Sequence, residues 1–157
     1  MIDYPPLQSP KALKKYYDHA KKEEKINPVP LISVAKMISI FKEEERFKSY
    51  QSVWEQFTKT HPQVKYVMID GKHRSTAMTL AGKKIKCRVI QSDQDTKELF
   101  DLKQKRKLKI AGIKQTLKET ILILEKHFFE KKYFWTVEEK IKLMIINKDI
   151  PKEMIKK

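Results

Sequence analysis

Residues 64–90 read VKYVMIDGKHRSTAMTLAGKKIKCRVI, and this stretch decides the fold. Residues 64–69 are β-branched, aromatic and apolar over the length of a buried strand, and residues 85–90 have the same character. Asp70-Gly71 predicts a turn, and residues 74–82 predict a short helix closed by a C′ glycine. The resulting strand–turn–helix–strand unit has a connection shorter than the dozen or more residues usual in a parallel crossover.

Helices are predicted on both sides of this unit, because apolar residues recur there at helical spacing behind capping residues. Before the unit, the predicted segments are a helix from Pro10 to about Ala20 capped by Ser9, an extended segment at residues 29–32, a helix capped by Ser33 and a helix that starts at Ser49. After the unit, a capping box of Asp95 and Glu98 opens a predicted helix over residues 95–110, and the next helix carries the apolar stripe of residues 113–128. A capping box of Thr136 and Glu139 opens the last predicted helix. The sequence therefore predicts an α+β fold, with a small mixed sheet, flanking helices and a helical C-terminal region. We expect the division to fall between residues 1–92 and residues 93–157.

The chain carries an excess of positive charge. Its 157 residues include 35 Lys and Arg against 20 Asp and Glu, a formal net charge of +15. Residues 61–90 carry seven basic side chains and one acidic side chain, Asp70, so the strand–turn–helix–strand unit is the most cationic part. Only four of the basic residues are arginine, and lysine suits unspecific phosphate attraction better than the reading of base edges. The composition is also that of a chain from an AT-rich genome, so charge alone leaves nucleic-acid binding open.

Several classes of protein are excluded at this stage. No apolar run is long enough to span a bilayer, and the first residues lack the basic and apolar regions of a secretory signal. We therefore expect a cytoplasmic protein without a membrane partner. The single cysteine, Cys87, excludes an internal disulfide and fits a reducing compartment. Its place in a predicted strand predicts a small buried hydrophobe.

The turn after the first strand collects groups that bind phosphate. Backbone N–H groups at a helix N-terminus point outward, the helix dipole adds partial positive charge, and glycine allows a ligand to approach the backbone. The candidate phosphate ligands are Gly71, Lys72, His73, Arg74, Ser75 and Thr76. Asp70 is the candidate catalytic residue and metal ligand, because its carboxylate could bind a phosphate-bridging Mg²⁺ or accept a proton from a hydroxyl nucleophile. The alternative is an ordinary turn with a solvated helix start, in which Arg74 pairs with Asp70.

The segment from Tyr66 to Ile90 resembles the core of the ParB/sulfiredoxin superfamily. Members of that superfamily place an Asp-Gly-x-His-Arg or related turn between a strand and a helix, end the helix with Leu-x-Gly, and continue into a strand of the type Ile-x-Val-x-Val. The matching residues here are Asp70-Gly71-Lys72-His73-Arg74, Leu80-Ala81-Gly82 and the strand that ends at Ile90. A weaker similarity reaches back to Pro30-Leu31.

The resemblance implies nucleotide binding at this turn. The equivalent segment binds CTP in ParB proteins and ATP in sulfiredoxins, so ATP or CTP with Mg²⁺ is the expected cofactor. Gly71, His73 and Arg74 would hold the phosphates. Sulfiredoxins place a cysteine where this chain has Lys72, so sulfinic-acid repair is not expected. The second arginine-rich motif of ParB proteins is matched poorly by residues 101–106.

A second basic segment lies after this unit. Its candidate nucleic-acid ligands are Lys103, Lys105, Arg106, Lys107 and Lys109, although a solvated helix face has the same composition. We therefore expect a ParB-like nucleotide-binding protein that works on or beside DNA, with NTP hydrolysis or nuclease activity as a further expectation. One alternative is a small-molecule phosphotransferase of the free-serine-kinase type with Asp70 as the base, and another is a catalytically silent interaction module. The C-terminal helices are the expected contact of a homodimer.

Overall fold

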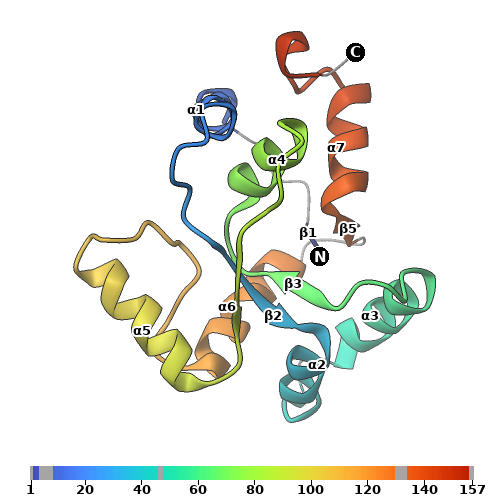
Figure 1. Ribbon diagram of the computed structural model, residues 1–157. Coiled ribbons are helices and arrows are strands. Elements are labelled where there is room, and N and C mark those ends of the chain that lie inside the picture. The colour runs from blue at the N-terminus through green and yellow to red at the C-terminus, as the bar shows by residue number, and fades with distance from the viewer. Residues whose placement is uncertain (1, 4–8, 46–47, 130–133, 156–157) are drawn as a thin grey trace.

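The structure is a computed structural model that describes residues 2–3, 9–45, 48–129 and 134–155 (Figure 1). Its elements in chain order are β1 (Ile2–Asp3), α1 (Pro10–Lys21), β2 (Val29–Ser33), α2 (Val34–Lys42), α3 (Lys48–Thr60), β3 (Tyr66–Met68), α4 (Lys72–Leu80), β4 (Cys87–Ile90), α5 (Asp93–Gln104), α6 (Leu117–Phe129), β5 (Trp135–Thr136), α7 (Val137–Ile146) and a 3-10 turn (Lys152–Met154). The predicted α+β class is confirmed.

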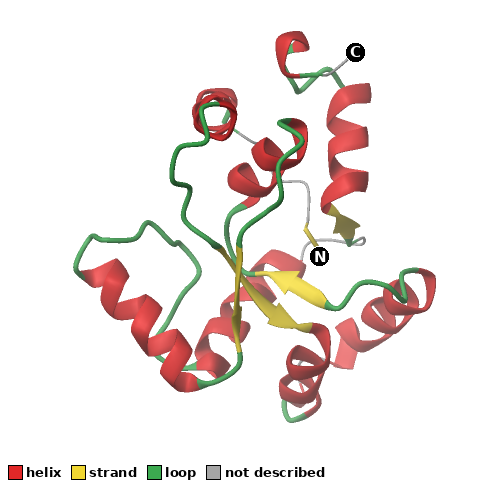
Figure 2. Ribbon diagram, in the orientation of Figure 1, coloured by secondary structure: helices red, strands yellow, loops and turns green. Residues whose placement is uncertain are grey.

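The described strands form one mixed sheet at the centre of the molecule, in the order β4–β2–β3–β1–β5 (Figure 2). β2 pairs with β3 in antiparallel orientation and with β4 in parallel orientation. The two strands of the predicted strand–turn–helix–strand unit are therefore not neighbours, because β2 lies between them, and they run in opposite directions. The short connection through α4 consequently does not have to build a parallel pair.

Alternating side chains of β2 and β3 build a hydrophobic core on each face of the sheet. Ile32 and Val67 belong to one cluster of buried residues, with side chains from α2, α3, α5 and α6. Leu31 and Met68 belong to a second cluster, with side chains from α1, α4 and α7. Figure 1 shows these two groups of helices on opposite sides of the strands. Burial on both faces explains why these strands read as continuous apolar runs rather than as alternating ones.

The division predicted after residue 92 runs through a shared core. Ile90 and Leu99 pack in the same cluster, and so do Ile32 and Ile121. The short strand β5 also pairs with β1 at the other end of the chain, through Asp3 and Trp135. The helical C-terminal region is therefore part of the same packed unit as the sheet.

Capping residues fixed the starts of three helices, α1, α2 and α7, as predicted. Ser9 Oγ accepts a hydrogen bond from the Ala12 N–H, and the predicted box of Thr136 and Glu139 opens α7. The start of α5 was predicted wrongly. Its N-cap is Ser92, and Asp95 is the N3 residue of the capping box, so the helix begins at Asp93.

The ends of α5 and the start of α6 also differ from the prediction. α5 ends at Gln104 rather than near residue 110, and Arg106, which follows the C-cap Lys105, adopts a left-handed conformation with φ of 55°. α6 begins at Leu117, so Ile113 lies ahead of the helix although it is fully buried. The side chain of Phe128, the last residue of the predicted stripe, lies outside the described residues.

The prediction that Cys87 is buried was wrong. β4 lies at the end of the sheet, with β2 as its strand neighbour, and the Cys87 thiol is exposed. An edge strand presents one of its long sides to solvent, so residues of strand character do not have to be buried there.

Candidate functional site

The turn between β3 and α4 has a backbone conformation that only glycine adopts without strain. Gly71 has a φ of +107°, and a Cβ atom there would lie 3.0 Å from Cγ2 of Val29 and 3.1 Å from Nη2 of Arg74. Gly71 is also the N-cap of α4, which begins at Lys72, two residues earlier than predicted. The predicted Asp-Gly turn is therefore present, and it brings α4 close against β2.

The Asp70 carboxylate is used as a structural acceptor. Its Oδ1 accepts a hydrogen bond from the Gly71 N–H at 2.6 Å. Its Oδ2 accepts from Arg74 Nη2 at 3.4 Å and from the Ala111 N–H at 3.2 Å. This contact between Asp70 and Arg74 was expected under the alternative interpretation, in which the segment is an ordinary turn. One carboxylate thus fastens the turn, the first turn of α4 and a distant loop.

Arg74 is buried, with 4% of its surface exposed. Its Nη1 donates hydrogen bonds to the carbonyl oxygens of Asn27 at 3.0 Å and Pro28 at 2.7 Å, which holds the segment before β2. A guanidinium has five N–H donors, and the described residues supply acceptors to three of them. The Arg74 side chain is therefore not solvated, unlike that of the half-buried Lys72, and two of its N–H donors have no acceptor among the described residues.

His73 serves as a hydrogen-bond acceptor. Its Nε2 accepts from the Ser9 N–H at 3.0 Å, at the start of α1. A protonated ring could not accept this bond, so the ring is neutral in this arrangement. Burial lowers the pKa of His73 below its ordinary value, and the neighbouring Lys72 lowers it further, against a smaller opposite effect of Asp70. His73 therefore adds no full positive charge near pH 7.

Ser75 and Thr76 are fully buried. The Ser75 hydroxyl donates to the carbonyl oxygen of Lys72 at 3.0 Å, within the first turn of α4. Lys72 is half-buried, and burial lowers its pKa, while Asp70 raises it by a smaller amount. Lys72, Ser75 and Thr76, all predicted as phosphate ligands, lie outside the cavity described next.

The remaining turn residues line an open cavity of about 540 Å³, here called the larger cavity. Its lining residues are Tyr16 of α1, Asp70, Gly71, His73 and Arg74 of the turn and α4, Lys103 of α5, and Arg106, Leu108, Lys109, Ile110 and Ala111 of the following loop. The turn and the basic segment, which the sequence presented as two separate candidates, therefore meet in one place. Lys105 and Lys107 are exposed and lie outside the cavity.

Two hydrogen bonds and two buried side chains hold the loop that closes this cavity. Lys103 Nζ donates to the carbonyl oxygen of Ala111 at 3.1 Å, and the Ala111 N–H donates to Asp70. Ile110 and Ile113 are buried in the core on either side of it. Gly112 lies so close to β3 that a Cβ atom would be 3.3 Å from the carbonyl oxygen of Ile69. In the sequence, Gly112 is the signal from which this close approach of the loop to the residue after β3 could have been predicted.

The larger cavity is cationic. Among the described residues that line it, four carry a positive charge and one a negative charge: Arg74, Lys103, Arg106 and Lys109 against Asp70. The N-terminus of α4 adds the partial positive charge of the helix dipole. The apolar part of the wall comes from Tyr16, Leu108 and Ile110, none of which was predicted. The arrangement suits an anion that also carries an apolar or aromatic body.

The site does not fit a resident Mg²⁺ ion. In the part of the chain that the structure describes, no three His, Cys, Asp or Glu side chains come together as metal ligands. Among the described residues that line the larger cavity, Asp70 is the single carboxylate, and three N–H donors already occupy its oxygens. A magnesium site needs several oxygen ligands in near-octahedral geometry.

No family model, curated protein or solved structure matches this chain. The resemblance to the ParB/sulfiredoxin superfamily therefore rests on the residues of the turn and its flanking elements. None of the helices that the structure describes is both long and apolar enough to cross a membrane.

Proposed function

We propose that the chain binds the phosphate groups of a nucleotide, of the ATP or CTP class, in the larger cavity. The observation that carries the proposal is the meeting of two distant cationic segments. Lys103, Arg106 and Lys109 line the same space as the Asp70–Arg74 turn. A cluster of cations with a glycine turn at a helix N-terminus is an arrangement that binds phosphate.

Size and lining support a nucleotide rather than a bare phosphate. A volume of about 540 Å³ falls within the range of small-molecule pockets, roughly 300 to 1,000 Å³. Arg74 keeps two N–H donors that have no acceptor among the described residues and that can serve the phosphates. Tyr16 and Leu108 offer surface to the nucleoside.

The geometry favours binding over phosphotransfer. A general base must accept a proton within hydrogen-bond reach of its substrate. The Asp70 oxygens already accept three N–H hydrogen bonds from the protein, so both oxygens are occupied before a substrate hydroxyl arrives. The binding proposal does not need an unoccupied general base. Phosphotransfer of the free-serine-kinase type, NTP hydrolysis and nuclease activity do need one, and Asp70 does not supply it.

DNA association is a second candidate, favoured by the cations at the rim of the larger cavity. Lys105 and Lys107 are exposed on either side of Arg106, which lines the cavity. Such a surface would attract a phosphate backbone without reading its sequence. A gel-shift titration of duplex and single-stranded DNA should give an affinity that falls steeply with salt, and the absence of a shift at low salt would remove this candidate.

Homodimerisation through the C-terminal helices is also a proposal. Ile145 and Ile146 on α7 are exposed, at 37% and 73% of their surface, and could take part in such an interface. Light scattering of the wild type and of Ile146→Glu tests it, because a dimer that uses this face should dissociate in the variant.

A thermal-shift screen tests nucleotide binding. ATP, ADP, CTP and GTP are each added with and without Mg²⁺, and a nucleotide that binds the folded state raises Tm. Lys109→Gln should reduce the shift, whereas Lys107→Gln, with the same change of charge outside the cavity, should keep it. If no nucleotide shifts the wild type, the catalytically silent interaction module becomes the better interpretation.

A further inference from the structure

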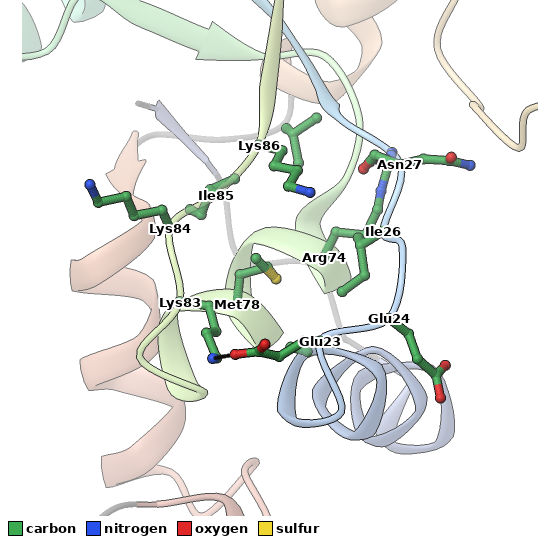
Figure 3. A pocket seen from close by; sticks show the side chains of 12 residues that line it. Glu23, Glu24, Ile26, Asn27, Arg74, Met78, Lys83, Lys84, Ile85 and Lys86 are labelled. Carbon is green, nitrogen blue, oxygen red and sulfur yellow. Dashed lines mark hydrogen bonds and ion pairs between the residues drawn. The ribbon is translucent and has the colours of Figure 1, made fainter.

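A second, smaller cavity of about 200 Å³ lies on another side of Arg74 (Figure 3). It is enclosed by the end of α1 and the segment that follows it, by α4, and by the segment that leads into β4. Its apolar lining residues are Ala20, Ile26, Val29, Met78 and Ile85. The first four of these are buried, so the interior of the cavity is a fixed part of the core.

Some of the charged residues that line the smaller cavity form ion pairs, and others do not. Lys83 forms an ion pair with Glu23, and Glu24 pairs with His19. Arg74 has three protein acceptors and two N–H donors left. Lys86 forms no ion pair with any described residue.

The close-up view separates the lysines of this segment. The Lys86 side chain bends over the space between Met78 and Arg74, whereas Lys84 points away from it (Figure 3). Lys86 and Arg74 therefore both line a cavity with apolar walls, and the two carboxylates that also line it, Glu23 and Glu24, pair with Lys83 and His19. Lys86 and the two remaining N–H donors of Arg74 have no acceptor among the described residues.

We propose that the smaller cavity binds a small carboxylate with a flat apolar body, such as an aromatic acid. An apolar cavity of about 150 Å³ holds one benzene molecule, so about 200 Å³ accommodates one ring or two fused rings. The ring lies against Met78 and Ile85, and the carboxylate accepts hydrogen bonds from Lys86 and Arg74. Arg74 lines both cavities, so its two remaining N–H donors are shared between this proposal and nucleotide binding in the larger cavity, whereas Lys86 lines the smaller cavity and not the larger one.

The experiment is a titration with indole-3-carboxylate and, separately, with uncharged indole. Binding is measured by isothermal calorimetry and by the shifts of backbone amide NMR signals. We expect the carboxylate to bind the wild type about fivefold more tightly than indole, in line with one partly exposed ion pair. The shifts should concentrate at residues 26–29, 78 and 83–87. Inorganic phosphate should not displace the carboxylate.

Matched variants separate the carboxylate contact from the ring contact. Lys86→Gln should weaken the carboxylate about fivefold and leave indole unchanged, whereas Lys84→Gln should change neither. Ile85→Trp, at a half-buried position, should fill the cavity and abolish both, with its fold checked by circular dichroism. The proposal is overturned if the carboxylate does not saturate the wild type by about 10 mM, if Lys86→Gln and Lys84→Gln behave alike, or if the shifts map to the larger cavity.

Discussion

Lys140 makes the stability of this protein depend on pH in a way that one substitution can reveal. The residue lies on α7 and is fully buried, beside Val137, Ile141 and Met144 of the same helix. Burial lowers its pKa from 10.5 to about 7. In the unfolded chain the ammonium group keeps its proton up to the ordinary value.

The direction of the effect follows from these two pKa values. Between about pH 7 and pH 10.5 the unfolded state binds more protons at Lys140 than the folded state, so the free energy of unfolding rises with pH. One pKa unit corresponds to about 1.4 kcal/mol. At pH 7 half of the folded molecules carry a proton on Lys140. Integrating the difference in bound protons from pH 7 to pH 9 gives an increase of about 2 kcal/mol in the free energy of unfolding of the wild type.

The perturbation is Lys140→Met, which keeps an unbranched side chain of similar length and removes the titrating group. Urea unfolding at pH 6, 7, 8 and 9 gives the free energy of unfolding of each variant. We expect the variant to be more stable than the wild type at pH 7, and this advantage to shrink by about 2 kcal/mol by pH 9. The difference between the free energies of unfolding of the variant and the wild type at each pH removes the contribution of all other titrating groups.

Lys142→Met is the matched control, because Lys142 is exposed on the same helix. It should follow the wild type at every pH. A Lys140→Met advantage that does not change between pH 7 and pH 9 would refute the reasoning, since Lys140 would then keep its proton in the folded state.

Three further substitutions test the local structure by chemical unfolding. Gly71→Ala should destabilise the protein by about 2 kcal/mol, because a side chain at φ of +107° is strained and meets Val29; an unchanged midpoint would contradict this account of the turn. Asp70→Asn should lower stability by about 1 to 3 kcal/mol, because its amide NH₂ cannot accept the bonds that Arg74 and Ala111 donate; a variant as stable as the wild type would make the carboxylate free for other roles. Lys148→Gly should raise stability by about 1 kcal/mol, because Lys148 follows the C-cap Asn147 of α7 with a left-handed φ of 60°. Lys142→Gly inside the helix should lower stability by a similar amount; equal signs for the two changes would refute the argument from conformation.

Local signals in the sequence predicted most of the elements. Ser9 before Pro10, and Thr136 before Glu139, are short-range patterns whose hydrogen bonds form within one helix turn. Asp95 shows the limit of such patterns, because an aspartate can be an N-cap itself or the third residue of a capping box opened by Ser92. The strands β1 and β5 have two residues each, too short for any periodicity to show.

The candidate site could be predicted only in part, because its two halves are distant in sequence. The Asp70-Gly71 turn was visible in the residues, but the meeting of that turn with Lys109 depends on the packing of Ile110 and Ile113 in the core. Burial of Arg74 was not visible either, since a charged residue at a helix start is usually solvated. Its acceptors are backbone carbonyls of Asn27 and Pro28, which no side-chain pattern encodes.

The central claim is that phosphate groups bind between the turn and the basic loop. Isothermal titration with ATP and with CTP measures it most directly in two double variants of equal charge. Arg106→Gln with Lys109→Gln removes two cations of the larger cavity, and Lys105→Gln with Lys107→Gln removes two cations outside it. The account predicts at least about tenfold weaker binding in the first and at most a twofold change in the second. Equal losses in both would mean that overall charge, and not this cavity, attracts the nucleotide.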